Sequence, residues 1–187
     1  MIDAFRTAVE TVGGTVKVAR DYTEAVKIVQ EICRVKTIRS AVISRGPLVE
    51  RLNLKSPLNS DGIAVGFTAE LSDADTVKEI EKADLGVTEA LAGVAETGTV
   101  VIVTVFEADR LASALPPNHI VLLDRDRVIA SMEEVASLVE KSVHHEKYTL
   151  SLITGPSSTS DIEKILVRGV HGPNSLFIIL IGRNESD

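Results

Sequence analysis

The sequence has 187 residues, a length typical of one domain, and it carries a net charge of −7. This acidic balance argues against a nucleic-acid binder, because it leaves no basic face able to neutralise a row of phosphates. The longest apolar runs, such as Leu176–Ile181, are far shorter than the roughly 20 residues that a helix needs to cross a bilayer. We therefore expect a single domain over residues 1–187, located in the cytoplasm, that binds neither membrane nor nucleic acid.

Helical periodicity alternates along the chain with short extended runs. The first helix keeps its apolar residues on one face and is ended by Gly13-Gly14. Asp21 and Glu24 form a capping box for the second helix. Predicted helices run from Ile2 to Val12, from Asp21 through Ile32, over Leu48–Leu54, Asp73–Lys82 and Ser131–Lys141, and from one of residues 157–160 through Leu166.

The extended runs are continuous stretches of Val, Ile and Leu, which is typical of strands whose sheet is covered on both faces. Their alternation with helices predicts an α/β fold with a largely parallel sheet and helices on both faces. The predicted strands are Thr15–Ala19, Ile38–Ser44, Gly62–Phe67, Leu85–Thr88, Thr99–Val105, Ile120–Leu123, Leu150–Thr154 and Leu176–Ile181.

The segment that follows the strand Leu150–Thr154 is the first candidate site. It places a glycine turn and a row of hydroxyl groups before a predicted helix, where unpaired backbone amides favour an anion. Capping of that helix explains the same hydroxyls equally well, so both interpretations stay open. Asp161 already occupies the positive end of the helix, which favours a carboxylate over a triphosphate. The candidate ligand-binding residues here are Gly155, Ser157, Ser158, Thr159 and His171.

Four spaced motifs carry a resemblance over nearly the whole chain. They are Phe5–Gly14, Ala83–Thr88 followed by Ala95–Thr99, the Pro-Pro-x-His-Ile segment Pro116–Ile120, and Leu150–Pro173. In this order they resemble the LUD-domain family, of the lactate utilization protein C type. The resemblance implies a fold like that of ribose-5-phosphate isomerase and the CoA transferases. Ser158 departs from the arginine that many members carry, so the anion bound by this chain could differ from theirs.

Glu96 is the second candidate, in the turn Ala95-Glu96-Thr97-Gly98. CoA transferases carry a nucleophilic glutamate in a short Glu-x-Gly motif, so the implied fold gives Glu96 a catalytic interpretation, with Thr97 and Gly98 as ligand-binding neighbours. The alternative is that Glu96 hydrogen-bonds nearby backbone amides and fixes the turn. We favour the alternative, because so short a motif is weak evidence.

No metal or cofactor is predicted. None of the four histidines has the helical spacing or the cysteine partners of a metal site, and His119 is expected to be structural. Cys33 is the sole cysteine and is expected to be a packed thiol in a helix. Nucleotide-binding glycine motifs, flavin, haem and iron–sulfur ligand patterns are absent from the sequence.

Two classes of function follow. The resemblance implies an accessory subunit that acts with separate iron–sulfur proteins in the oxidation of L-lactate to pyruvate and carries no redox cofactor itself. The alternative is a small enzyme or sensor that binds an anionic metabolite, such as a carboxylate, in a CoA transferase-like site around Glu96. We favour the non-catalytic subunit, and a homo-oligomer is compatible with the sequence.

Overall fold

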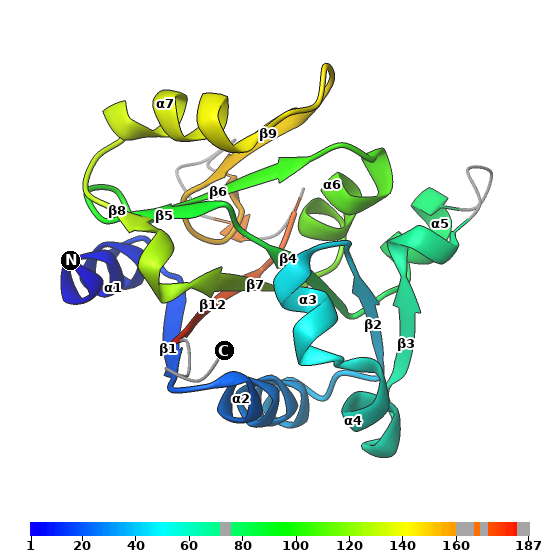
Figure 1. Ribbon diagram of the computed structural model, residues 1–187. Coiled ribbons are helices and arrows are strands. Elements are labelled where there is room, and N and C mark those ends of the chain that lie inside the picture. Colours follow the sequence, from blue (N-terminus) through cyan, green and yellow to red (C-terminus); the bar gives the residue numbers. More distant parts are fainter. Residues whose placement is uncertain (72–75, 160–166, 169–171, 183–187) are drawn as a thin grey trace.

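A six-stranded sheet forms the centre of the computed structural model, which describes residues 1–71, 76–159, 167–168 and 172–182 (Figure 1). Every neighbouring pair of strands in this sheet runs parallel. The predicted class, α/β with a largely parallel sheet covered by helices, is confirmed. In order across the sheet the strands are β1 (Thr15–Ala19), β12 (Ser175–Ile181), β7 (Asn118–Asp124), β4 (Leu85–Glu89), β2 (Ser40–Ile43) and β3 (Ala64–Phe67).

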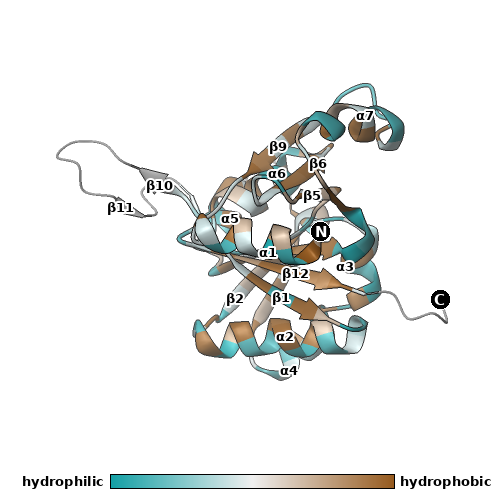
Figure 2. Ribbon diagram, turned by 90° about the vertical axis from the view of Figure 1, so that its left-hand side faces the viewer, coloured by the Kyte–Doolittle hydropathy of each residue, from teal (hydrophilic) through white to brown (hydrophobic). Residues whose placement is uncertain are grey.

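A second sheet of four short strands lies over one face of the parallel sheet (Figures 1 and 2). Its strands pair antiparallel, apart from the parallel pair β5 and β8. Two of the predicted strands belong here rather than to the parallel sheet, which their continuous apolar sequence did not reveal. The order is β8 (Val128–Ile129), β5 (Ala92–Val94), β6 (Thr99–Thr104) and β9 (Thr149–Ile153).

Helices cover both faces of the parallel sheet, and Figure 2 shows the layers stacked from α2 and α4 up to α7. Helices α2, α3 and α4 enclose the larger apolar core on one face. On the other face lie α1, α5, α6 and the second sheet, which α7 covers from its far side. The helices are α1 (Ile2–Thr11), α2 (Tyr22–Val35), α3 (Pro47–Leu52), α4 (Lys55–Ser60), α5 (Thr76–Glu81), α6 (Glu107–Ala114) and α7 (Glu133–Ser142).

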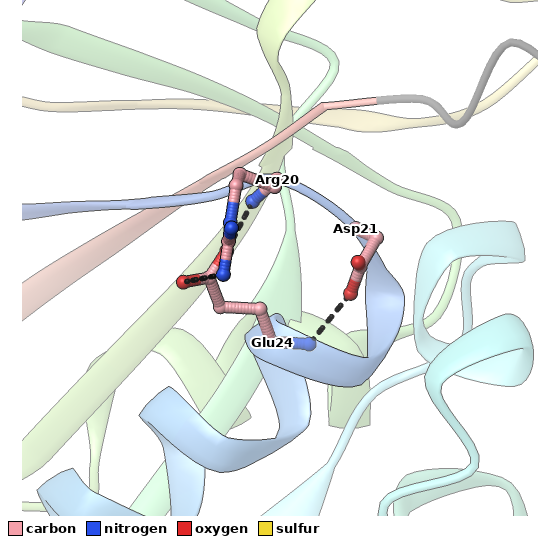
Figure 3. A network of polar contacts seen from close by, with 3 residues as sticks. All are labelled: Arg20, Asp21 and Glu24. Atoms are coloured by element: carbon pink, nitrogen blue, oxygen red, sulfur yellow. Dashed lines mark hydrogen bonds and ion pairs between the residues drawn. The ribbon is translucent and has the colours of Figure 1, made fainter.

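The start of α2 has the predicted cap (Figure 3). The Asp21 carboxylate accepts a hydrogen bond from the Glu24 backbone N–H at 2.8 Å. The reciprocal half of the box differs, because Glu24 accepts from the backbone N–H and the Nε of Arg20, at 2.7 and 2.9 Å. The Arg20 side chain therefore lowers the pKa of the Glu24 carboxyl.

Helix boundaries differ from the predictions where apolar periodicity is weak. Helices α4 and α6 were not predicted, and the predicted helix Leu48–Leu54 is α3, which ends at Leu52 where Asn53 adopts a left-handed conformation. The described part of the predicted helix Asp73–Lys82 is α5, since residues 72–75 lie outside the described chain. In the part of the chain that the structure describes, no helix combines the length and the apolar sequence that crossing a bilayer requires.

The predicted start of a helix at Ser158 or Thr159 is wrong. Both residues form strand β10, which pairs antiparallel with β11 (Val167–Arg168). The ends of this segment are also joined by backbone, since the Ser157 N–H donates to the Pro173 carbonyl at 2.8 Å. A helix start at Ser160, the remaining predicted position after these two, lies outside the described residues. The predicted apolar anchors at 162, 165 and 166 lie outside the described residues.

Candidate functional site

The predicted turn after β9 lines a pocket of about 390 Å³. Gly155 and Ser157 line it, together with Thr154, the residue after β9. Arg110 of α6 and His119, the second residue of β7, also line it. The pocket therefore lies at the amino ends of the central parallel strands. We call it the turn pocket.

The glycines of the two predicted turns have a structural explanation. Gly98 and Gly155 have positive φ angles of 69° and 84°, a conformation that glycine adopts without steric cost. A Cβ atom at Gly98 would lie 2.5 Å from the backbone nitrogen of Val9, and one at Gly155 2.5 Å from the carbonyl oxygen of Val12. Both turns therefore pack directly against the backbone of the first helix and the residue that ends it.

A chain of threonine hydroxyls connects the two predicted turns. The Oγ1 atoms of Thr97 and Thr99 are 2.7 Å apart, and those of Thr99 and Thr154 are also 2.7 Å apart. Thr97 is thus brought close to the turn pocket. Its hydroxyl is, however, already hydrogen-bonded within this chain.

The Glu96 side chain contacts the start of α7 rather than the turn pocket. Its side chain is exposed, and Oε2 accepts a hydrogen bond from the backbone N–H of Met132, the residue before α7, at 3.1 Å. Its own backbone N–H donates to the carbonyl of Ala130 at 3.0 Å. Because Glu96 satisfies an amide at a helix start, it contributes to the attachment of α7. It is not among the described residues that line the turn pocket.

The other predicted ligand residues of the turn are only partly described. Ser158 and Thr159 are paired in β10, as stated above. His171 lies outside the described residues, although its neighbour Gly172 lines the turn pocket.

His119, which we predicted to be structural, proves to be the most unusual group in the turn pocket. Its side chain is 0% exposed, and Nε2 lies 2.8 Å from the Thr88 Oγ1. Nδ1 has no hydrogen-bond partner among the residues that the structure describes. Burial lowers the pKa of His119 to about 3, so the imidazole is neutral at physiological pH. A neutral ring can donate from one nitrogen and accept at the other.

A second cleft, of about 550 Å³, lies at the opposite, carboxyl ends of the parallel strands. Arg45 follows β2, Glu89 ends β4, Asp124 ends β7, and Arg127 follows shortly after. We call it the carboxyl-end cleft. Sequence reasoning did not propose it, although charged residues directly after three predicted strands were a usable signal.

Glu89 is held in this cleft by backbone amides. Its Oε2 accepts from the Leu48 N–H at 2.7 Å, and the amide of Val49 adds to the stabilisation of the charged form. Burial nevertheless dominates and raises the pKa of the Glu89 carboxyl, with Arg127 opposing the shift. The result is a half-buried carboxyl group in a fixed position.

Arg45 is also fixed. Its Nη1 and its backbone N–H donate to the buried Asp109 carboxylate at 3.0 and 3.1 Å, and Thr68 donates to the same carboxylate. The guanidinium carbon lies 4.0 Å from the centre of the Phe106 ring. Helix α6 and its N-cap residue thus orient the arginine at the cleft, and Thr68 helps to hold the carboxylate of Asp109. Within the described ranges, no cluster of His, Cys, Asp or Glu could hold a metal ion.

Comparison with known proteins gives a consistent picture. A family model described as the LUD domain matches residues 2–181. Lactate utilization protein C of Bacillus subtilis (strain 168) is 31% identical over 147 residues, which are 75% of this chain and 61% of that protein. The uncharacterized protein YkgG of Escherichia coli (strain K12) is 31% identical over 153 residues, 80% of this chain and 66% of that protein. The chain therefore spans less than two thirds of the length of these relatives.

Among solved structures, a DUF162 family protein from Deinococcus radiodurans has the same fold. The TM-score is 0.68 at 22% sequence identity, and the match covers 97% of this chain and 96% of that one. An identity this low establishes the fold and leaves the activity open.

Proposed function

The chain belongs to the LUD-domain family, and we propose from this that it takes part in the utilization of lactate. More narrowly, we propose a non-catalytic accessory subunit that acts in the cytoplasm with separate iron–sulfur proteins in the oxidation of L-lactate to pyruvate. Relatives that carry the name lactate utilization protein C support the broader statement. On this proposal the redox cofactors belong to the partners, and this chain binds a small carboxylate.

The turn pocket is the proposed carboxylate site. The single observation that carries it is the buried His119, whose Nδ1 has no partner among the described residues although it lines a pocket. Leaving a buried polar atom unpaired costs about 1–3 kcal/mol, so a ligand that hydrogen-bonds to it gains affinity. Arg110 lines the same pocket; its Nε and Nη2 already donate to the Glu107 carboxylate, so a bound carboxylate would be a second partner of this guanidinium group.

The neutral state of His119 also favours a particular ligand chemistry. A neutral imidazole can hydrogen-bond a hydroxyl or a carbonyl oxygen without adding a second positive charge. Lactate and pyruvate each place one such group beside a carboxylate. The carboxylate would meet Arg110, and the hydroxyl or carbonyl would meet His119.

Thermal unfolding with added L-lactate, pyruvate or acetate tests this assignment. A ligand present at 100 times its dissociation constant stabilises the protein by about 2.7 kcal/mol, or roughly 5–10 °C in Tm for a domain of this size. We expect L-lactate or pyruvate to raise the Tm and Arg110→Gln to abolish the rise. Arg125→Gln, an exposed arginine outside the pocket, is the control. Absence of a shift with all three compounds contradicts the assignment.

Reconstitution tests the accessory role. The purified chain should show no lactate oxidation alone, and it should raise the rate when added to iron–sulfur proteins encoded beside it. Lactate oxidation by the chain alone would overturn the proposal, as would full activity of the partners without it. The alternative, a CoA transferase-like site around Glu96, has no comparable support, because that carboxylate is exposed and bonded to the start of α7.

A further inference from the structure

The carboxyl-end cleft occupies the switch point of the parallel sheet. The chain leaves β2 toward β3 at the sheet edge and then crosses back, so that β4 lies on the other side of β2. After β2 it forms α3 on one face, and after β4 it enters the second sheet on the other face. Two loops that diverge in this way leave a crevice at the strand ends, and ligands of open α/β sheets bind there. Figure 1 shows α3 beside the ends of these strands.

The cleft holds charges of both signs in fixed positions. Glu89 is fixed by the amides of Leu48 and Val49, and Arg45 is fixed by Asp109. Arg127 is exposed, and in the described part of the chain it forms none of the ion pairs. Its charge acts on Glu89, whose pKa it lowers against the effect of burial, so the Arg127 guanidinium belongs to the charges of the cleft.

Different parts of one ligand suit these groups. The guanidinium groups of Arg127 and Arg45, which both line the cleft, suit a carboxylate or a phosphate. The Glu89 carboxylate suits a hydroxyl donor, because its position is set by backbone and does not need to reorganise on binding.

We propose that the carboxyl-end cleft binds a small hydroxylated anion, with Arg127 and Arg45 meeting the anionic group and Glu89 accepting a hydrogen bond from a hydroxyl. The volume of about 550 Å³ fits a ligand larger than lactate. The site lies at the opposite end of the sheet from the turn pocket and does not depend on the function proposed above. The anionic group can be a carboxylate or a phosphate, and the experiment separates the two.

Titration calorimetry with defined probes tests the proposal. D-Glycerate and glycerol 3-phosphate carry both groups, whereas propionate and inorganic phosphate lack the hydroxyl and glycerol lacks the charge. We expect saturable binding of at least one hydroxylated anion, at least tenfold tighter than its counterpart without the hydroxyl. The preferred probe identifies the anionic group as carboxylate or phosphate.

Substitutions test whether the probe binds in the carboxyl-end cleft. Arg127→Gln and Glu89→Gln should each weaken the preferred probe at least tenfold. Arg125→Gln should not, because Arg125 lies on the same short turn but does not line the cleft. Arg127 is exposed, so its substitution tests the site even if Glu89→Gln unfolds the protein.

Three results would overturn the proposal. The first is absence of saturable binding by both hydroxylated anions. The second is equal binding of inorganic phosphate and glycerol 3-phosphate, which would indicate a nonspecific anion contact. The third is binding that Arg127→Gln leaves unchanged.

Discussion

The buried imidazole of His119 makes the stability of this protein depend on pH in a defined direction. Burial lowers its pKa from 6.5 to about 3 in the folded state. Between these two values the unfolded chain binds a proton that the folded protein does not bind, so stability falls as the pH falls below about 6.5. Above pH 6.5 the imidazole is neutral in both states, and this contribution is constant.

The size of the effect follows from the two pKa values. Lowering the pH from 7.5 to 5.5 protonates the unfolded imidazole almost fully and leaves the folded one neutral. Because pH 5.5 lies one unit below the unfolded pKa of 6.5, the free energy of unfolding falls by about 1.4 kcal/mol. For a domain of this size, that loss lowers the Tm by roughly 3–6 °C. Other groups titrate in the same range, so the contribution has to be measured as a difference.

His119→Asn provides that difference. The variant loses the titration but keeps a polar group beside Thr88, so its Tm should fall less than that of the wild type between pH 7.5 and 5.5, by roughly 3–6 °C. His144→Asn, which removes an exposed histidine outside the turn pocket, should behave like the wild type. If wild type and His119→Asn lose the same stability over this interval, the argument from burial is wrong.

Three further substitutions or reactions test local features. Gly155→Ala should lower the free energy of unfolding by about 1–3 kcal/mol more than Gly62→Ala. Both glycines have positive φ, but only Gly155 lies against neighbouring backbone. Equal losses in denaturant titrations would contradict the packing argument. Glu96→Ala should cost about 1 kcal/mol through the lost hydrogen bond at α7, whereas Glu96→Gln should cost less; a larger loss with Gln would point to a role for the charge. Cys33 is buried and its pKa is raised to about 11, so iodoacetamide should label it at neutral pH only in denaturant; rapid labelling of the folded protein would contradict its burial.

The sequence predicted the parts of the fold that local patterns determine. Helices α1, α2 and α7 and the strands of the parallel sheet have apolar residues at helical spacing or in continuous runs, and these patterns require no knowledge of distant residues. Helix α6 was not predicted because Glu107–Ala114 is short and buries small or polar side chains, namely Asp109, Ala112 and Ser113. Its packing depends instead on Gly86, whose missing side chain lets the carbonyl of Ala112 approach β4. That contact joins residues far apart in the sequence.

In the candidate sites, too, local sequence patterns predicted some features and contacts between distant residues decided the others. A glycine followed by hydroxyls predicted a ligand-binding turn before a helix. Gly155 and Ser157 line a pocket, and ligand binding there stays a prediction. Thr159 pairs with Val167 instead of starting a helix, and that pairing depends on the return of the chain.

The carboxyl-end cleft could not be assembled from sequence because its residues meet only through strand order. Arg45 is held by Asp109, which is 64 positions away, and Glu89 by Leu48, which is 41 positions away. Each residue alone resembles an ordinary charge at the end of a strand. Their juxtaposition requires β4 to lie beside β2, a choice that no local pattern specifies.

The second sheet contributes lining residues to both sites, so neither site could be predicted in full from a single parallel sheet. Strand β9 lines the turn pocket through Ser151–Ile153, and its partner β6 contributes Val103 to the carboxyl-end cleft. The two strands pair in register, with Val103 opposite Leu150 and Val101 opposite Leu152. One antiparallel ladder therefore bounds a pocket at the amino end of the parallel sheet and a cleft at its carboxyl end. A prediction that places β6 and β9 within the parallel sheet lacks this ladder, and it therefore lacks residues that line each site.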